Sequence, residues 1–251
     1  MDHPLLLFVL SFLTLWLSAR FGASVVRNWI KLDAGARADF GTVLATTLTL
    51  NGLIIGFTFS MAIGRYELRK NYEEAEANAI GTEFVRADLM PAADAAQVRE
   101  LLRVYVDQRL AFYNAGSEQE VRQINIRTAQ LQTQLWKGVL GMPAAQPTAV
   151  GSLVIAGMND VLNSQGYTQA AWWNRIPLAA WILMAAIAVI SHLLIGYGAH
   201  NTRTESILMT VLPLVVSIAF LLIADIDSPR SGIIRVAPRD LSTLAESLRA
   251  S

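Results

Sequence analysis

Long apolar runs separated by polar stretches dominate the pattern along this chain. One of them extends from Gly41 to Gly64 without a charged residue or a proline, and it passes directly into a charged sequence that begins at Arg65. A helix of about 20 residues, rising roughly 1.5 Å per residue, crosses a hydrocarbon core of roughly 30 Å. The pattern therefore predicts a membrane-spanning helix that continues into water.

Three other runs satisfy the same length criterion, so the sequence predicts about four spans. Their approximate ranges are 4–26, 41–64, 176–200 and 206–224. We interpret the first run as a retained span rather than a cleaved signal peptide, because no lysine or arginine precedes it and no small-residue cleavage site closes it cleanly. The third and fourth runs predict a tight transmembrane hairpin within residues 175–227.

The segment between the second and third spans, residues 65–174, predicts helices rather than strands. No proline lies between Gly41 and Met90, so one helix could be continuous across this range. Further along, apolar residues recur at steps of three and four, which is typical of helices packed in a bundle. The tail, residues 228–251, predicts a short amphipathic helix. The predicted fold class is an all-α polytopic membrane protein, with its first two spans in residues 1–64 and a helical extramembrane domain after them.

Composition supports a membrane protein and excludes other classes. Hydrophobic residues make up 53% of the chain and charged residues 16%, which is too apolar for an ordinary soluble domain of 251 residues. The formal net charge is zero, and no segment is basic enough to predict nucleic acid as a partner. Because the chain has no cysteine, it can form neither a disulfide nor a thiolate metal site.

Flanking charge predicts the orientation. Four spans place both termini and the 65–174 segment on one side of the membrane. More arginine and lysine residues flank the spans on that side than on the other, which favours a cytoplasmic domain. We therefore expect a multi-pass protein of the cell inner membrane with a cytoplasmic helical domain and cytoplasmic termini.

Intramembrane polar side chains mark the second span as the segment most relevant to function. Several threonines and Asn51 lie along it, so part of this helix should face protein or water rather than lipid. His192 in the third span is the other polar residue of interest. Both an interhelical hydrogen bond and a functional role explain a histidine at this place.

The sequence carries no recognisable catalytic set. Its three histidines lack metal-ligand spacing, and no phosphate loop, nucleophile elbow or zinc motif is present. Glu73, Glu74 and Glu76 could suggest the paired carboxylates of a hydrolase, but ion pairs of Arg69 with Glu73 and of Lys70 with Glu74 explain them more simply, and no neighbouring histidine completes an acid–base set. We predict that the protein is not an enzyme and has no cofactor and no metal centre.

Two carboxylates, Asp225 and Asp227, close the fourth span and have two interpretations. They could be hard oxygen ligands of a cation site, although calcium takes six to eight ligands and other groups would be needed. Alternatively, they could form a structural cap that pairs with arginines such as Arg230, while Pro229 and Gly232 turn the chain. The turn signal favours the cap, and both interpretations stay open.

Two stretches of the chain resemble the bestrophin-like family of bacterial membrane proteins, whose function is largely unassigned. They are the sequence from Glu74 to Leu89 and the sequence from Asp225 to Val236. In addition, Gly56-Phe57 followed by Arg65-Tyr66 at the end of a polar span is similar to the second-helix signature of true bestrophins. The first similarity covers nearly the whole chain, and the second covers only this span and its exit.

The resemblance to bestrophins, which are pentameric anion channels, carries expectations about a pore. It implies a homo-oligomer, such as a pentamer, that conducts inorganic ions, contacts membrane lipid and places Phe57 in a narrow apolar neck. Leu53 and Thr49 lie one and two turns back on the same helix face. Leu53 can replace the bulky apolar group of bestrophins there, whereas Thr49 is a departure. The dense acidic run of the bestrophin calcium clasp is absent, and Asp225 and Asp227 are at best a thin analogue.

The residues themselves lead to a compatible hypothesis. A polar-faced span with an apolar tip suits a helix that lines a pore, because hydrophobic constrictions can gate by dewetting. The leading hypothesis is an oligomeric ion channel that conducts anions, with the second span lining the pore. The alternative is a non-conducting scaffold or sensor that acts through its helical domain, in which the small polar residues of that span are packing contacts.

Overall fold

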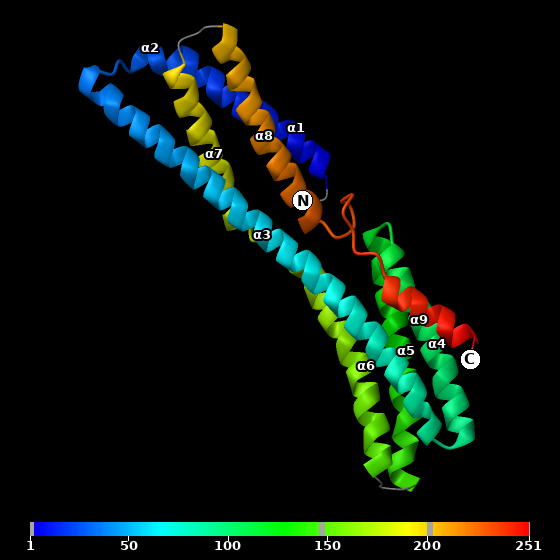
Figure 1. Ribbon diagram of the computed structural model, residues 1–251. Helices are drawn as coiled ribbons and strands as arrows, with labels where there is room; N and C mark the ends of the chain where they lie inside the picture. Colours follow the sequence, from blue (N-terminus) through cyan, green and yellow to red (C-terminus); the bar gives the residue numbers. More distant parts are fainter. Residues whose placement is uncertain (1–2, 146–148, 200–202, 251) are drawn as a thin grey trace. The chain divides into compact units, whose positions relative to one another are not determined.

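The computed structural model describes residues 3–145, 149–199 and 203–250 (Figure 1). Every regular element in these ranges is a helix, which confirms the all-α class. Among the described residues, four helices are long and apolar enough to cross a membrane, as the apolar runs predict. The chain divides into two compact units, which we call the membrane unit (Met1–Arg65 with Arg175–Arg235) and the helical unit (Tyr66–Asn174 with Val236–Ser251).

The membrane unit contains the spans. Within it, α1 packs against both α7 and α8. The first half of α3 also belongs to this unit. The bounds of these elements are α1 (Pro4–Phe21), the π-helical turn η1 (Gly22–Val26), α2 (Arg27–Trp29), α3 (Ala34–Arg86), α7 (Leu178–Gly198) and α8 (Arg203–Asp227).

Two helices extend beyond the apolar runs that predict the spans. The helix α3 begins at Ala34, ahead of Gly41, because the Asp33 carboxylate accepts the Ala36 N–H at 2.8 Å and so caps a first turn that the apolar run does not include. The helix α8 continues to Asp227, three residues beyond the fourth apolar run. The predicted end of the third span, residue 200, lies outside the described residues.

A pair of glycines brings the first span against α7. A Cβ atom at Gly22 would overlap the backbone oxygen of Leu193, and one at Gly196 would overlap the backbone oxygen of Ala19. Such contact between helix backbones is possible only where side chains are absent. The two glycines therefore fix the point where α1 and α7 are closest.

The helical unit is built around one apolar core. Its helices supply side chains at helical spacing, and full burial of each large aliphatic group stabilises the unit by roughly 1.5–3 kcal/mol. Central members of the core are Ile80, Val98, Leu102, Leu135 and Met158. Besides the second half of α3, the elements are η2 (Ala87–Leu89), α4 (Ala92–Asn114), α5 (Glu118–Ala145), α6 (Ala149–Trp173) and α9 (Arg239–Ala250).

One helix, α3, contributes to both units. It has 53 residues and is therefore about 80 Å long at 1.5 Å per residue. The α-helix ends at Arg86 and is followed by the 3₁₀ turn η2 and an extended Met90 immediately before Pro91. The proline-free stretch of the sequence is thus continuous helix for nearly all of its length.

Candidate functional site

The membrane half of α3 has one buried face and one open face. Asn51, Thr58 and Ala62 are buried within the membrane unit. Leu53 and Phe57, in contrast, expose 52% and 64% of their surface, and Thr49 is exposed on the same side. The structure therefore places the three residues singled out from the sequence together on a face that the single chain leaves uncovered.

Small residues extend this open face. A Cβ atom added at Gly41, Gly52, Gly56 or Gly64 would meet no other atom within 4 Å. These glycines are consequently not required for any contact inside the single chain. A helix face that combines exposed glycines with exposed apolar side chains allows the close approach of another helix or of a permeating species.

The threonines of α3 satisfy their own donors. The hydroxyl of Thr46 donates to the carbonyl of Thr42 at 2.8 Å, and that of Thr49 donates to the carbonyl of Ala45 at 2.9 Å. Hydroxyls that bond one turn back do not need a partner outside the helix. The threonines of this span therefore do not by themselves require contact with water. This weakens the inference from the sequence that the polar residues must face protein or water.

The two intramembrane polar residues are both buried. The Asn51 side-chain oxygen has no hydrogen-bond partner in the part of the chain that the structure describes. The Nδ1 atom of His192 lies 2.7 Å from the Ala188 carbonyl oxygen of its own helix. A role for either residue beyond packing stays a prediction.

The Asp225 carboxylate holds the chain that follows α8. Its two oxygens accept the backbone N–H groups of Ile233 at 2.7 Å and Ile234 at 2.8 Å. Gly232 passes so close that a Cβ atom there would overlap the Asp225 carbonyl oxygen. The carboxylate therefore folds the 228–235 loop back onto the end of the helix.

The Asp227 carboxylate connects the end of α8 to the start of α7. The Ile176 N–H lies 3.0 and 3.2 Å from its two oxygens, and a guanidinium nitrogen of Arg65 lies 4.0 Å from one of them. The sequence did not identify either contact, because both partners are remote along the chain. Among the described residues, no group of three or more His, Cys, Asp or Glu could hold a metal ion.

A buried ionic network in the helical unit was also missed from the sequence. Arg109 donates through Nε to one Glu76 oxygen and lies 3.4 Å from the other through a terminal nitrogen. Thr168 donates to the second oxygen at 3.0 Å, and the guanidinium lies 4.7 Å from the Phe112 ring centroid. Burial lowers the pKa of Arg109, but the Glu76 charge, the hydrogen bond to Glu76 and the neighbouring Tyr105 and Tyr113 together outweigh it, so the pKa is raised. The sequence interpretation, which pairs Arg69 with Glu73 and Lys70 with Glu74, does not predict this bond from Glu76 to another helix.

Two further carboxyl groups are buried in the helical unit. Burial raises the pKa of Glu83 to about 8, and Asp160 adds to the rise while Arg86 opposes it. Neither Glu83 oxygen has a hydrogen-bond partner among the described residues. Burial also raises the pKa of Glu73 to about 7, although its carboxylate accepts the Leu241 N–H at 2.9 Å. These groups do not form a catalytic pair with any histidine in the described chain.

Comparison with known proteins gives a consistent result. Residues 5–241 match the Bestrophin-like domain family. A bacterial bestrophin homologue from Klebsiella pneumoniae, phased with zinc, is similar over 98% of this chain and 97% of its own, with 13% identity and a TM-score of 0.64. A variant of a homologue from the same organism, with isoleucine replaced by alanine, is similar over 99% and 97% with 11% identity and a TM-score of 0.69. At these identities the likeness shows the fold. No curated protein sequence matches the chain.

Proposed function

The chain belongs to the bestrophin-like family, and from this premise we propose that it forms a homo-oligomeric ion channel in the membrane. The family match includes both units of the chain and all four candidate spans. The chain is a multi-pass membrane protein, and we propose that it lies in the inner membrane with its helical domain in the cytoplasm. The proposal also divides the chain into span pairs at 1–64 and 175–227, a helical domain at 65–174 and a tail at 228–251.

The observation that carries the proposal is the open face of α3. Thr49, Leu53 and Phe57 lie on it, while the opposite side of the same helix is buried in its own unit. Closed rotational symmetry brings the same face of every copy toward a common axis. A ring of copies, such as a pentamer, would then surround a path with a polar Thr49 level and an apolar constriction at Leu53 and Phe57.

We propose that the channel conducts anions. The family relationship supports them, and no aspartate or glutamate lies between Gly41 and Gly64, so the span lacks the acidic ring that attracts cations in cation channels. An apolar constriction at Phe57 would control ion passage through dewetting rather than by binding the ion.

We also propose that Asp225 and Asp227 are structural caps and not calcium ligands. The two Asp225 oxygens accept the N–H groups of Ile233 and Ile234, and the two Asp227 oxygens share the Ile176 N–H. Two carboxylates also supply too few ligands for calcium. These carboxylates therefore do not supply a donor set like the calcium clasp of bestrophins. If this is correct, calcium will leave the melting temperature unchanged, and Asp225→Asn will lower it with or without calcium.

Electrical recording tests the channel directly. We would reconstitute the purified protein in a planar bilayer and measure the reversal potential under a potassium chloride gradient. A shift toward the chloride equilibrium potential supports an anion channel, whereas a shift toward potassium retains the pore and overturns its selectivity. Silence of correctly inserted protein, together with a monomeric mass in detergent, favours a non-conducting scaffold or sensor that acts through the helical domain.

A further inference from the structure

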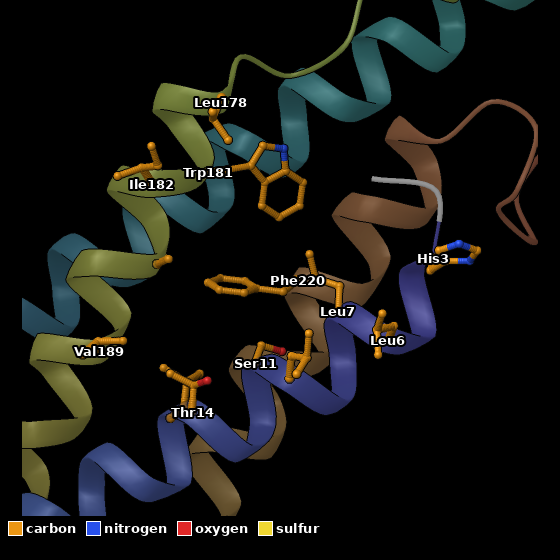
Figure 2. Close-up of a pocket in the computed structure, with 13 residues that line it drawn as sticks. His3, Leu6, Leu7, Ser11, Thr14, Leu178, Trp181, Ile182, Val189 and Phe220 are labelled. Carbon is orange, nitrogen blue, oxygen red and sulfur yellow. The ribbon is translucent and has the colours of Figure 1, made fainter.

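A cavity of about 490 Å³ that is open to the surface lies between α1, α7 and α8 of the membrane unit (Figure 2). Its walls come from residues 3–15 of the first span, residues 178–189 of α7, and Phe220 of α8. This volume is within the range of roughly 300–1,000 Å³ that is usual for small-molecule pockets. The cavity does not include the open face of α3, so it is separate from the proposed pore.

Helix packing explains why the cavity exists. The glycine contacts hold α1 and α7 together near Gly22 and Gly196, whereas the cavity lies toward the first turns of both helices. The rings of Trp181 and Phe220 are perpendicular, with centroids 6.4 Å apart, and both point into the space between α7 and α1 (Figure 2). Both rings line the cavity, and space remains beside them.

The lining chemistry is suited to hydrocarbon. Leucine, isoleucine, valine and aromatic side chains dominate it, and the Ser11 hydroxyl is satisfied by the Phe8 carbonyl of its own helix at 3.0 Å. Water needs two to four polar partners, so it is poorly accommodated on such walls. Because the walls are membrane spans, the material that reaches the cavity from outside is lipid or another span.

Size distinguishes these two occupants. The cavity extends over about 18 Å of the first span, from His3 to Leu15, at 1.5 Å per residue. Its volume of about 490 Å³ then corresponds to a mean cross-section of roughly 27 Å². A helix about 10 Å in diameter has a cross-section of roughly 80 Å². A helix of a second copy is therefore too wide to enter the cavity, whereas a single extended hydrocarbon chain is not.

The cavity also has the length and direction of one lipid leaflet. It begins at the exposed polar residue His3, immediately before the first span, and ends beside Leu15 and Val189. A length of about 18 Å is slightly more than half of a hydrocarbon core of roughly 30 Å. We propose that this cavity binds one acyl chain of a membrane phospholipid, with the headgroup at the His3 end and the chain terminus near Leu15 and Val189.

A photoreactive phospholipid tests this assignment. The probe is a phosphatidylethanolamine that carries a diazirine near the end of one acyl chain, reconstituted with the full-length protein in vesicles, illuminated and mapped by peptide mass spectrometry. We expect labels concentrated on the deep parts of the cavity, around residues 14–15 and 185–189. Labels spread evenly over the exposed surfaces of all spans would overturn the proposal, because they indicate only the general lipid shell.

Matched variants separate filling of the cavity from general disturbance. Ala185 and its neighbour Ala186 are both exposed, but only Ala185 lines the cavity. We expect Ala185→Trp to reduce the deep labelling at least fivefold and Ala186→Trp to leave it unchanged. On the first span, Leu10 lines the cavity and exposed Leu13 does not, so Leu10→Trp and Leu13→Trp form a second pair if an α7 variant fails to fold. Undiminished deep labelling in folded Ala185→Trp or Leu10→Trp protein would refute the proposal.

Discussion

Arg109 on α4 donates to Glu76 on α3 at a place where neither side chain has any solvent-exposed surface. Burial of two charges is costly, and their attraction compensates only if the remaining polar atoms are also satisfied. Thr168 on α6 supplies one such bond to the Glu76 carboxylate. The pair and Thr168 therefore connect three helices of the helical unit.

Removal of one charge from this pair should destabilise the protein strongly. Glu76→Gln leaves Arg109 charged and buried, and the loss of one partner of a buried pair typically costs about 3–5 kcal/mol. We expect a large decrease in the melting temperature of the detergent-solubilised full chain. Glu74→Gln is the control, because Glu74 is an exposed carboxylate two residues away. Equal melting temperatures for the two variants would show that the buried pair contributes little.

Replacement of Phe57 by alanine should increase the unitary conductance. The exposed ring, 64% accessible in the single chain, is proposed to form the narrowest apolar level, so its removal widens and hydrates the path. Single-channel recording in planar bilayers measures the change. Ile63→Ala is the matched control, because Ile63 is an exposed apolar residue on a different side of α3. An unchanged current for Phe57→Ala would remove Phe57 from the pore.

The two glycine contacts lead to a test of span packing. Gly196→Ala places a methyl group against the Ala19 carbonyl oxygen, which is backbone and cannot move aside. The cost should exceed the roughly 1–3 kcal/mol typical of overpacking, and we expect a loss of folded protein by size-exclusion chromatography. Gly52→Ala adds the same methyl group where no atom lies within 4 Å and should behave as wild type. Normal folding of Gly196→Ala would show that α1 and α7 are not held together at this point.

Alkaline pH should destabilise the helical unit through Glu83. The pKa of this carboxyl is raised from 4.5 to about 8 by burial, so the folded protein binds a proton that the unfolded chain has already released between these values. The free energy of unfolding therefore falls as pH rises from about 4.5 to 8, by at most about 1.4 kcal/mol per pH unit for each such proton.

Thermal unfolding of the full chain at a series of pH values measures this effect. Glu83→Gln cannot ionise, so its melting temperature should depend less steeply on pH and should exceed that of wild type above pH 8. Glu73, whose pKa is raised to about 7, accounts for a remaining slope at lower pH. If Glu83→Gln retains the full wild-type slope, Glu83 is ionised in the folded protein.

Local sequence patterns predicted the parts of the fold that depend on local physics. The apolar runs identified four spans because the membrane imposes a length on each of them, and the absence of proline predicted the continuity of α3. The early start of α3 at Ala34 was missed because a single side chain, Asp33, decides it. A hydropathy pattern does not reveal a capping hydrogen bond of this kind, so it could not predict this helix start.

Contacts between distant residues were not predictable in the same way. Arg69 and Lys70 lie about two turns before Glu76 on its own helix, and only the folded structure shows that Arg109 of another helix bonds to it. The Asp227 carboxylate likewise bonds to a backbone N–H at Ile176, a partner that carries no residue-type signal at all. The open face that contains Phe57 was predicted only through family resemblance, since exposure in a single chain is a property of the packed unit.

The unbroken course of α3 gives the protein a mechanical property. Phe57 and Glu76 lie on the same helix, about 28 Å apart at 1.5 Å per residue, and no proline or π-helical turn interrupts the α-helix between them. The helix therefore has no kink or irregular turn between these two residues that could absorb a twist. A rotation of α3 about its own axis at Glu76 would therefore also reorient Phe57, the residue proposed for the apolar constriction.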